Sequence, residues 1–411
     1  RLRHDHAQQL QALLWRVRAS RMLSDAMARY SKLRYTYVVV GWVPSAQWPD
    51  LAAHLKAISA ETLIEARAQK RGGEGDTIPV AIHHRGLLRP FQQLVEMFAF
   101  PRYNELDPTF LLAITFPLLF GAMFGDVGHG AVLMLLGILL ASRRIKPLRG
   151  LAGLGGLVAI CGASGLAFGF LYGSVFGLED VLHPLWMQPI HNIMQILIVS
   201  IGAGIVLLGA GFALNILNAA IVRDWSRMLL DRNGLAGLVL YGSLIGLAAG
   251  ALSVPLPVPT AVFAASAGAA GLVVMFSDTL KRAAEGRRPL IEGGLGTYAV
   301  QIFFEMFDTL ISLLSNSLSY VRVGAFAVAH AGLSSVFFIL AAMVSPNRGA
   351  GWWIVVLIGN LFIVGFEGLI VGIQTVRLEY YELFSKFFQG GGMRFAPLTL
   401  LPSGKDRRAN T

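Results

Sequence analysis

Eight apolar segments dominate the chain after residue 108 and restrict what it can fold into. They cover approximately residues 108–125, 128–142, 151–178, 193–222, 233–252, 258–278, 294–343 and 352–388. A helix needs about 20 apolar residues to cross a bilayer. Only 14% of the 411 residues are charged, against ~25% in a soluble domain. The sequence therefore predicts a mainly α fold with a polytopic, eight-span helical membrane domain and two long, tilted C-terminal helices, and excludes a cytosolic enzyme.

The first two apolar segments are short and are joined by a glycine-rich stretch, residues 125–130. A single helix over residues 108–142 would be about 50 Å long, too long for one crossing. The sequence therefore predicts a hairpin, in which Asp126 and His129 are mainly structural and act as helix caps. Further along, Gly165, Gly169, Gly173 and Gly177 form a small-residue stripe, which predicts close helix packing.

The loops between the segments differ sharply in their basic residues. Lys and Arg gather in the loops after segments two, four and six and in the C-terminal tail. The loops 126–130, 178–192 and 252–258 carry none, and 344–351 carries only Arg348. Cytoplasmic loops are enriched in Lys and Arg. Both termini are therefore predicted to be cytoplasmic.

The first 105 residues have no long apolar run and are expected to form a partial α+β cytoplasmic domain. The sequence predicts a helix over 1–33, a strand over 35–44, a short helix capped by Ser45, a second strand over 62–67 and a loop over 70–75. Residues 106–411 would form the ion-translocating membrane domain. The chain begins with Arg1, so an upstream portion is expected to be missing. Membrane lipid is an expected partner; nucleic acid is not, because aromatic and basic residues are not interleaved.

Polar residues inside the last two segments are the main candidates for function, because charge in hydrocarbon is costly. At 100° per residue, one side of segment seven carries a polar stripe around Arg322. The stripe comprises Glu305, Asp308, Ser312, Ser315, Asn316, Ser319, His330 and Ser334. In segment eight, Asn360, Glu367 and Gln374 are spaced by seven, and Arg377 follows three residues later.

Structural explanations exist for several of these residues. Arg377 could be an interfacial anchor, since Glu379, Glu382 and Lys386 follow closely, and a long basic side chain can reach the membrane surface. Glu367 could simply neutralise an arginine, and His330 could be a packing histidine. Arg322 is flanked by apolar residues on both sides, which places it deep in the membrane.

Motifs for catalysis, cofactors or metals are missing. The sequence has no phosphate loop, no H-E-x-x-H, no G-x-S-x-G and a single cysteine, Cys161. The pairs His4/His6 and His83/His84 lack further ligands for a metal. The chain is therefore not expected to be an enzyme by itself, nor to hold a cofactor or a metal.

Several stretches together match one family of membrane proteins. Residues 116–130 read FPLLFGAMFGDVGHG, residues 319–322 SYVR, residues 327–334 AVAHAGLS, residues 376–379 VRLE, residues 385–388 SKFF, residues 395–397 FAP and residues 41–44 GWVP; Glu367-Gly368 stands ten residues before VRLE. On these residues the chain resembles the membrane subunit of rotary V/A-type ATPases, which is subunit a in eukaryotes and subunit I in bacteria and archaea. The family's cytoplasmic arm is longer than residues 1–105, which would be its membrane-proximal part.

The resemblance implies a stator that couples proton translocation to rotation. Arg322 and Arg377 would face the carboxylates of a rotating proteolipid ring, the c or K ring. Further partners would be peripheral-stalk subunits of the E/G type and a central-stalk cap subunit of the d/C type. The setting would be the plasma (inner) membrane of a prokaryote. Whether H⁺ or Na⁺ moves, and in which direction, is left open.

Helix direction divides the polar residues into two sets. Segment seven would run outward and segment eight inward. An outer half-channel would then use Glu367, His330, Gln374 and Ser334. A cytoplasmic half-channel would use Glu305, Asp308, Ser312 and Asn316. Two other functions compete: a secondary ion-coupled transporter with the Arg/Glu/His cluster as its site, for which no internal repeat is evident, and a structural anchor, against which the buried arginine argues.

Overall fold

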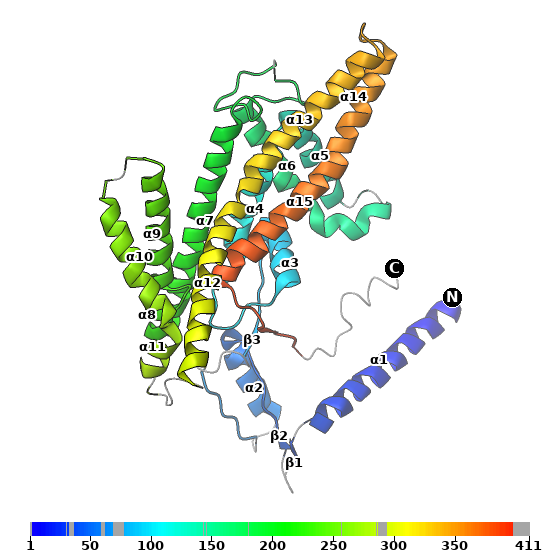
Figure 1. Ribbon diagram of the computed structural model, residues 1–411. Coiled ribbons are helices and arrows are strands. Elements are labelled where there is room, and N and C mark those ends of the chain that lie inside the picture. The colour runs from blue at the N-terminus through cyan, green and yellow to red at the C-terminus, as the bar shows by residue number, and fades with distance from the viewer. Residues whose placement is uncertain are drawn as a thin grey trace. The chain divides into compact units, whose positions relative to one another are not determined.

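The computed structural model of the chain describes residues 2–29, 31–32, 37–58, 62–68, 78–142, 144, 146–179, 181–255, 257–284, 286 and 294–397 (Figure 1). The chain divides into two compact units. The smaller consists of Arg1–Ala81 with Met393–Thr411, and the larger of Ile82–Gly392. The boundary predicted at residue 105 separates the cytoplasmic part from the membrane part of the chain, which is a different division from that into compact units. It stays a prediction.

The smaller unit begins with helix α1, Leu2–Arg29, which is free of Gly and Pro. Strand β1, Ser31–Lys32, pairs antiparallel with β2, Tyr37–Val38. A 3₁₀ turn, Ser45–Gln47, then leads into α2, Trp48–Ile58. Strand β3, Pro79–Val80, pairs in parallel with β4, Met393–Arg394.

Four predictions for this unit are wrong in detail. The helix predicted over 1–33 ends at Arg29, because Ser31–Lys32 pair as strand β1. The strand predicted over 35–44 is reduced to β2 among its described residues, because only that part has a partner strand. Residues 62–67 form no strand, since none of their backbone groups pair in a ladder. Ser45 is not a cap: Pro44 precedes the 3₁₀ turn, and no side chain caps it. The loop predicted over 70–75 lies outside the described residues.

The larger unit starts with an amphipathic helix, α3, Arg89–Phe98, after a 3₁₀ turn, Gly86–Leu88. It buries Phe91, Leu94 and Val95, and it packs on α4 and α6. The Phe98 ring contacts the rings of Tyr380, Phe384 and Phe388, and the Tyr380 hydroxyl donates to the Leu94 carbonyl at 2.6 Å. This aromatic contact ties the start of the unit to its end.

The first two apolar segments form separate helices, as predicted. Helix α4 is Thr109–Met123 and α5 is Val127–Ala141. Both pack on α6, Ala152–Tyr172, which follows a 3₁₀ segment, Lys146–Leu151. The main contacts of the predicted hairpin are therefore with α6 and not between its two arms.

Glycines bring α5 and α6 into backbone contact. Gly130 and Gly137 on α5 face Gly155 and Gly162 on α6, with a spacing of seven on each helix. A Cβ at Gly162 would lie 2.8 Å from the Gly130 carbonyl oxygen. The glycine stripe predicted at Gly165, Gly169, Gly173 and Gly177 is wrong in its second half, because α6 ends at Tyr172. Gly173 caps the helix with a φ of 75°, a left-handed conformation that favours glycine.

The remaining helices carry the rest of the apolar sequence. They are α7, Ile193–Val222; α8, Trp225–Leu230; α9, Leu235–Ala251; α10, Thr260–Met275; α11, Ser277–Ala284; α12, Leu295–Ser319; α13, Val321–Val344; α14, Ala350–Phe362; α15, Gly368–Arg377; and α16, Ser385–Phe387. Two π-helical segments, Ile363–Glu367 and Leu378–Phe384, interrupt the last helical run. Helix α13 packs on α14 and on α7, as Figure 1 shows in yellow, orange and green.

Five helical runs in the described residues are long and apolar enough to cross a membrane. They cover residues 149–172, 193–222, 225–251, 296–344 and 350–387. A sixth would be the pair α10–α11, which is bent by 62°. Helices α4 and α5 are apolar but shorter. The two C-terminal runs, of 49 and 38 residues, are the longest, as predicted; the count of eight spans and the tilt stay predictions.

The surface of the larger unit is apolar where a soluble protein would be polar. Val206, Leu357 and Leu361 each expose 71–72% of their surface. Exposed apolar patches of this kind need an apolar neighbour, and a row of such helices finds it in the hydrocarbon of a bilayer.

Candidate functional site

The most buried polar cluster lies where α5 begins and meets α13 and the first π segment. Asp126 is fully buried and caps α5. Its Oδ1 accepts from the backbone N–H of His129 and of Phe176, both at 2.9 Å. Its Oδ2 accepts from the Ser174 hydroxyl at 2.6 Å and from the Gly177 N–H at 2.8 Å. The cap expected at Asp126 is present, and it also anchors the loop after α6.

His129 is also fully buried. Its Nε2 lies 2.6 Å from Asn360 Oδ1 on α14. The Asn360 amide nitrogen donates to the Val356 carbonyl at 2.7 Å, which fixes the oxygen toward His129. Nε2 of His129 is therefore the donor, and its Nδ1 points toward Asp126 Oδ1 at 3.2 Å. His129 thus joins α5 to α14 and is not only a cap.

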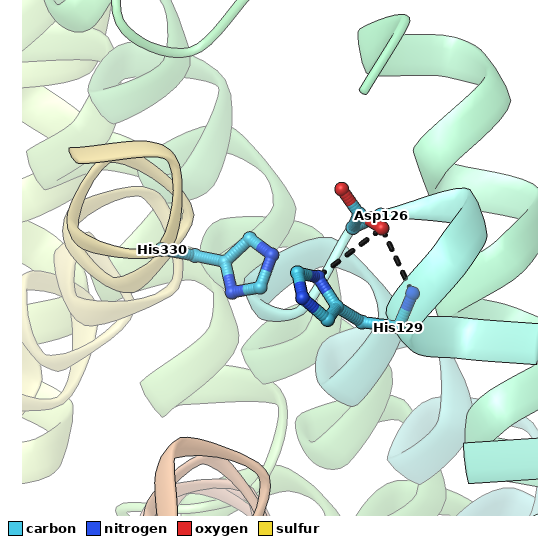
Figure 2. Close-up of side chains that lie close together, drawn as sticks. All are labelled: Asp126, His129 and His330. Atoms are coloured by element: carbon cyan, nitrogen blue, oxygen red, sulfur yellow. Dashed lines mark hydrogen bonds and ion pairs between the residues drawn. The ribbon is translucent and has the colours of Figure 1, made fainter. Parts of the chain in front are cut away.

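His330 on α13 lies opposite His129 in the same cluster. Its Nδ1 lies 3.0 Å from Glu367 Oε2, and both residues are buried. The ring centroids of His330 and His129 are 5.3 Å apart at an interplanar angle of 85°, and Figure 2 shows the two rings directed at each other beside Asp126. Ser334, one turn beyond His330, is buried, and its hydroxyl has no hydrogen-bond partner among the described residues.

Relative to His330 and Glu367, both arginines lie toward the predicted cytoplasmic side of their helices. Arg322 follows the break at Tyr320 between α12 and α13 and is half-buried. Its Nη1 is buried and, in the described part of the chain, lacks a hydrogen-bond partner. Arg377 is exposed at the end of α15. The two guanidinium groups are close enough to interact electrostatically with each other and with Glu382.

The residues predicted for a cytoplasmic half-channel all lie on α12. Asp308 and Ser312 line a cavity of about 160 Å³ together with Lys386 and Arg232. The Asn316 amide nitrogen lies 3.5 Å from the Ser312 hydroxyl. Glu305 is exposed and accepts from Gln301 at 2.8 Å. From the outer set, Gln374 is half-buried, and its Oε1 has no partner within the described ranges.

A second group of charged residues, for which the sequence predicts no role, is buried. Glu379 is fully buried, Glu382 is 4% exposed and Lys386 is 6% exposed. The Lys386 ammonium lies over the Phe212 ring, 5.5 Å from its centroid. In the sequence these residues are only the charges near Arg377, which is itself the possible interfacial anchor. Their spacing of three and four residues, shared with the buried Thr375, is the signal that places them on one inner face.

Asp126, His129 and His330 also form a grouping that their spacing in the sequence does not reveal. One ligand-type atom from each lies within 4.8 Å of the others. Asn360 belongs to this cluster as well, although it stands among the polar residues of segment eight without a predicted role.

Long apolar helices with lipid-facing surfaces, and polar groups gathered between them, define a helical integral membrane protein. The family model of the V-type ATPase 116kDa subunit family matches residues 2–150 and 295–400 of the chain. These ranges make up more than half of the chain, and the chain belongs to this family.

Curated relatives agree with the family match. A-type ATP synthase subunit I of Aeropyrum pernix is 29% identical over 372 residues, covering 80% of this chain and 52% of that protein. A-type ATP synthase subunit I of Methanocaldococcus jannaschii is 27% identical over 417 residues, covering 91% and 56%. V-type ATP synthase subunit I 2 of Treponema pallidum is 28% identical over 240 residues, covering 52% and 53%. The chain spans about half the length of these relatives.

Proposed function

We propose that this chain is the membrane part of subunit I of a rotary A/V-type ATPase, in which two offset half-channels lead ions to and from a rotating proteolipid ring. The observation that carries the proposal is the pair Arg322 and Arg377, which interact electrostatically at neighbouring positions of two apolar helical runs. Glu382 is the acidic group near both arginines in the described part of the chain, so one positive charge of the pair still needs an anionic partner, because charge in hydrocarbon is costly. A carboxylate of the ring supplies that partner once per passing subunit.

The polar groups on either side of the arginines support two separate paths. His330 lies eight residues beyond Arg322, about 12 Å along the helix, and its bond to Glu367 makes a buried polar pair there. Asp308 lies fourteen residues before Arg322, about 21 Å in the other direction, where it lines the cavity with Ser312. The outer path comprises Glu367, His330, Gln374 and Ser334. The cytoplasmic path comprises Glu305, Asp308, Ser312 and Asn316.

The chemistry of arginine explains how the paths stay separate. Its guanidinium keeps its charge even in a poor dielectric. A ring carboxylate that passes Arg322 is favoured in its ionised form and releases its proton to one path. When the carboxylate moves on into lipid, the neutral form is favoured, and it takes a proton from the other path. The fixed positive charge also repels protons that would leak directly between the paths.

The assembled setting follows from the same proposal. The chain would cross the membrane eight times, with residues 1–105 and the C-terminus on the cytoplasmic side of a prokaryotic plasma membrane. Its partners would be the proteolipid ring, E/G-type peripheral stalks and a d/C-type central-stalk cap. ATP chemistry would belong to other subunits of the complex.

The test is ATP-driven ion pumping by the assembled complex in vesicles. Arg322→Ala is expected to abolish pumping and Arg322→Lys to reduce it strongly, while copurification of the ring shows that assembly is intact. The control is Arg348→Ala, which removes an exposed arginine that lies over the Trp352 ring, at 5.6 Å from its centroid, and should pump normally. Full pumping by an assembled Arg322→Ala complex would refute the proposal.

A further inference from the structure

The cluster of Asp126, His129 and His330 has a hydrogen-bond arrangement that a helix cap and an ion path do not account for. The Asn360 oxygen takes the hydrogen on Nε2 of His129, so a neutral His129 ring presents a lone pair at Nδ1. That lone pair points at Asp126 Oδ1, another acceptor, at 3.2 Å. Two acceptors at this distance repel each other unless a proton or a metal ion lies between them.

His330 completes the arrangement. A carboxylate accepts hydrogen bonds, so the bond to Glu367 assigns the hydrogen of His330 to Nδ1. The lone pair is then on Nε2, an atom that is buried and, like Nδ1 of His129, has no hydrogen-bond partner in the described part of the chain. His330 is 2% exposed and His129 is 0% exposed. Figure 2 shows the His330 ring facing the His129 ring, with Asp126 next to His129.

We propose that Asp126, His129 and His330 bind one divalent transition-metal ion of the zinc type through Oδ1, Nδ1 and Nε2. Two imidazoles and one carboxylate are a ligand set that Zn²⁺ accepts, with bonds of about 2.0–2.2 Å. The tetrahedral geometry of Zn²⁺ places ligand atoms about 3.4 Å apart. The His129–Asp126 pair, at 3.2 Å, already meets this spacing. No pair is wider than 4.8 Å, so small rotations of the rings bring all three atoms into range.

The outer partners of the two histidines favour a metal as well. Ligating histidines donate their other ring N–H to a carboxylate or a carbonyl, which fixes the tautomer and strengthens the ligand. Glu367 holds His330 in this way, and Asn360 holds His129. Asp126 is held by four further donors, so the carboxylate is preorganised and costs little to orient.

Metal binding to the full chain in detergent tests the site without ATP or any partner. After chelator treatment, Co²⁺ is added as a spectroscopic probe and Zn²⁺ is counted by elemental analysis. We expect one ion per chain and the visible absorption of four-coordinate Co²⁺. His330→Ala and His129→Ala should each lower the affinity more than tenfold. The control His191→Ala, an exposed histidine 3.5 Å from Glu179, should bind as the unchanged chain does.

A ligand exchange separates binding from folding. His330→Cys should still bind Co²⁺ and add a sulfur-to-cobalt charge-transfer band in the near ultraviolet, a signature that a packing role cannot produce. Glu367→Gln and Asn360→Leu, which alter only outer partners, should weaken binding about 10- to 100-fold. Absence of the visible band in the unchanged chain, or the same stoichiometry and spectrum in His330→Ala, would overturn the proposal. His330 and Glu367 belong to both proposals, but metal binding is read on the chain in detergent and pumping on the assembled complex, so a failure of this site can be told apart from a failure of the proposed function.

Discussion

Removal of the Asp126 carboxylate should destabilise the larger unit far more than removal of an ordinary helix cap. In Asp126→Ala, α5 loses its cap, which costs about 1 kcal/mol. The N–H groups of Phe176 and Gly177 and the Ser174 hydroxyl also lose their acceptor. Each buried donor left unpaired costs about 1–3 kcal/mol. Because some of these donors are only partly buried, we expect a total loss of about 4 kcal/mol.

The chain offers a matched control in Asp224. This residue caps α8 with the same kind of bond, to the Arg227 N–H at 3.0 Å, but it is exposed and accepts no other hydrogen bond among those found in the described residues. Asp224→Ala should therefore cost about 1 kcal/mol. Asp126→Asn should lie between the two, at about 2 kcal/mol, because the amide keeps Oδ1 but turns a donor toward the Gly177 N–H.

The assay is equilibrium unfolding in mixed micelles, followed by far-ultraviolet circular dichroism and with a chelator present so that no metal contributes. The quantity compared is the free energy of unfolding of each variant. Equal losses in Asp126→Ala and Asp224→Ala would refute the reasoning, because they would mean that the buried donors find other partners. If Asp126→Ala does not fold, Asp126→Asn replaces it in the comparison. A loss of free energy larger than that of Asp224→Ala then supports the reasoning, and an equal loss refutes it.

Three further predictions concern packing, a backbone anchor and transport. Gly162→Ala should lower the free energy of unfolding by about 1–3 kcal/mol, because its Cβ would overlap the backbone of α5; Gly202→Ala, with open space around it, should not lower it in the same unfolding assay. Glu105 accepts from the Gly390 N–H at 3.3 Å and from two other backbone N–H groups, so Glu105→Ala should speed hydrogen exchange at Gly390 as read by mass spectrometry; unchanged exchange would contradict this. In vesicles, Glu367→Gln should reduce ATP-driven pumping without abolishing it, and an unchanged rate would remove Glu367 from the ion path.

The polar residues of the last two helical runs show what helical periodicity can and cannot predict. A wheel of 100° per residue places His330 and Glu367 on polar faces of two helices, and the structure joins them by a hydrogen bond of 3.0 Å. Glu379, Glu382 and Lys386 also share one face, yet the wheel does not say that this face is buried. The spacing of three and four residues places them on one face, but which helix covers that face depends on packing between segments distant in the sequence.

The glycines of α6 show a similar limit. A spacing of four suggests a stripe that includes Gly173, but the packed glycines are spaced by seven and face α5. Several small-residue patterns coexist in this glycine-rich segment, and only the position of the neighbouring helix selects the one that packs. The hairpin prediction likewise finds the break between α4 and α5 but not that both pack on α6.

By itself, the sequence determined that this chain enters a membrane, where its longest helical runs lie and which motifs assign it to its family. Hydropathy and helix breaks depend on residues that are close together in the sequence, so they can be identified without knowing which helices pack together. Only the tertiary structure decided which buried polar groups meet. His129 and Asn360 are 231 positions apart, and their contact depends on how α5, α13 and α14 pack. That packing creates the Asp126–His129–His330 cluster, since lone pairs and charges interact only at the distances that a folded core imposes.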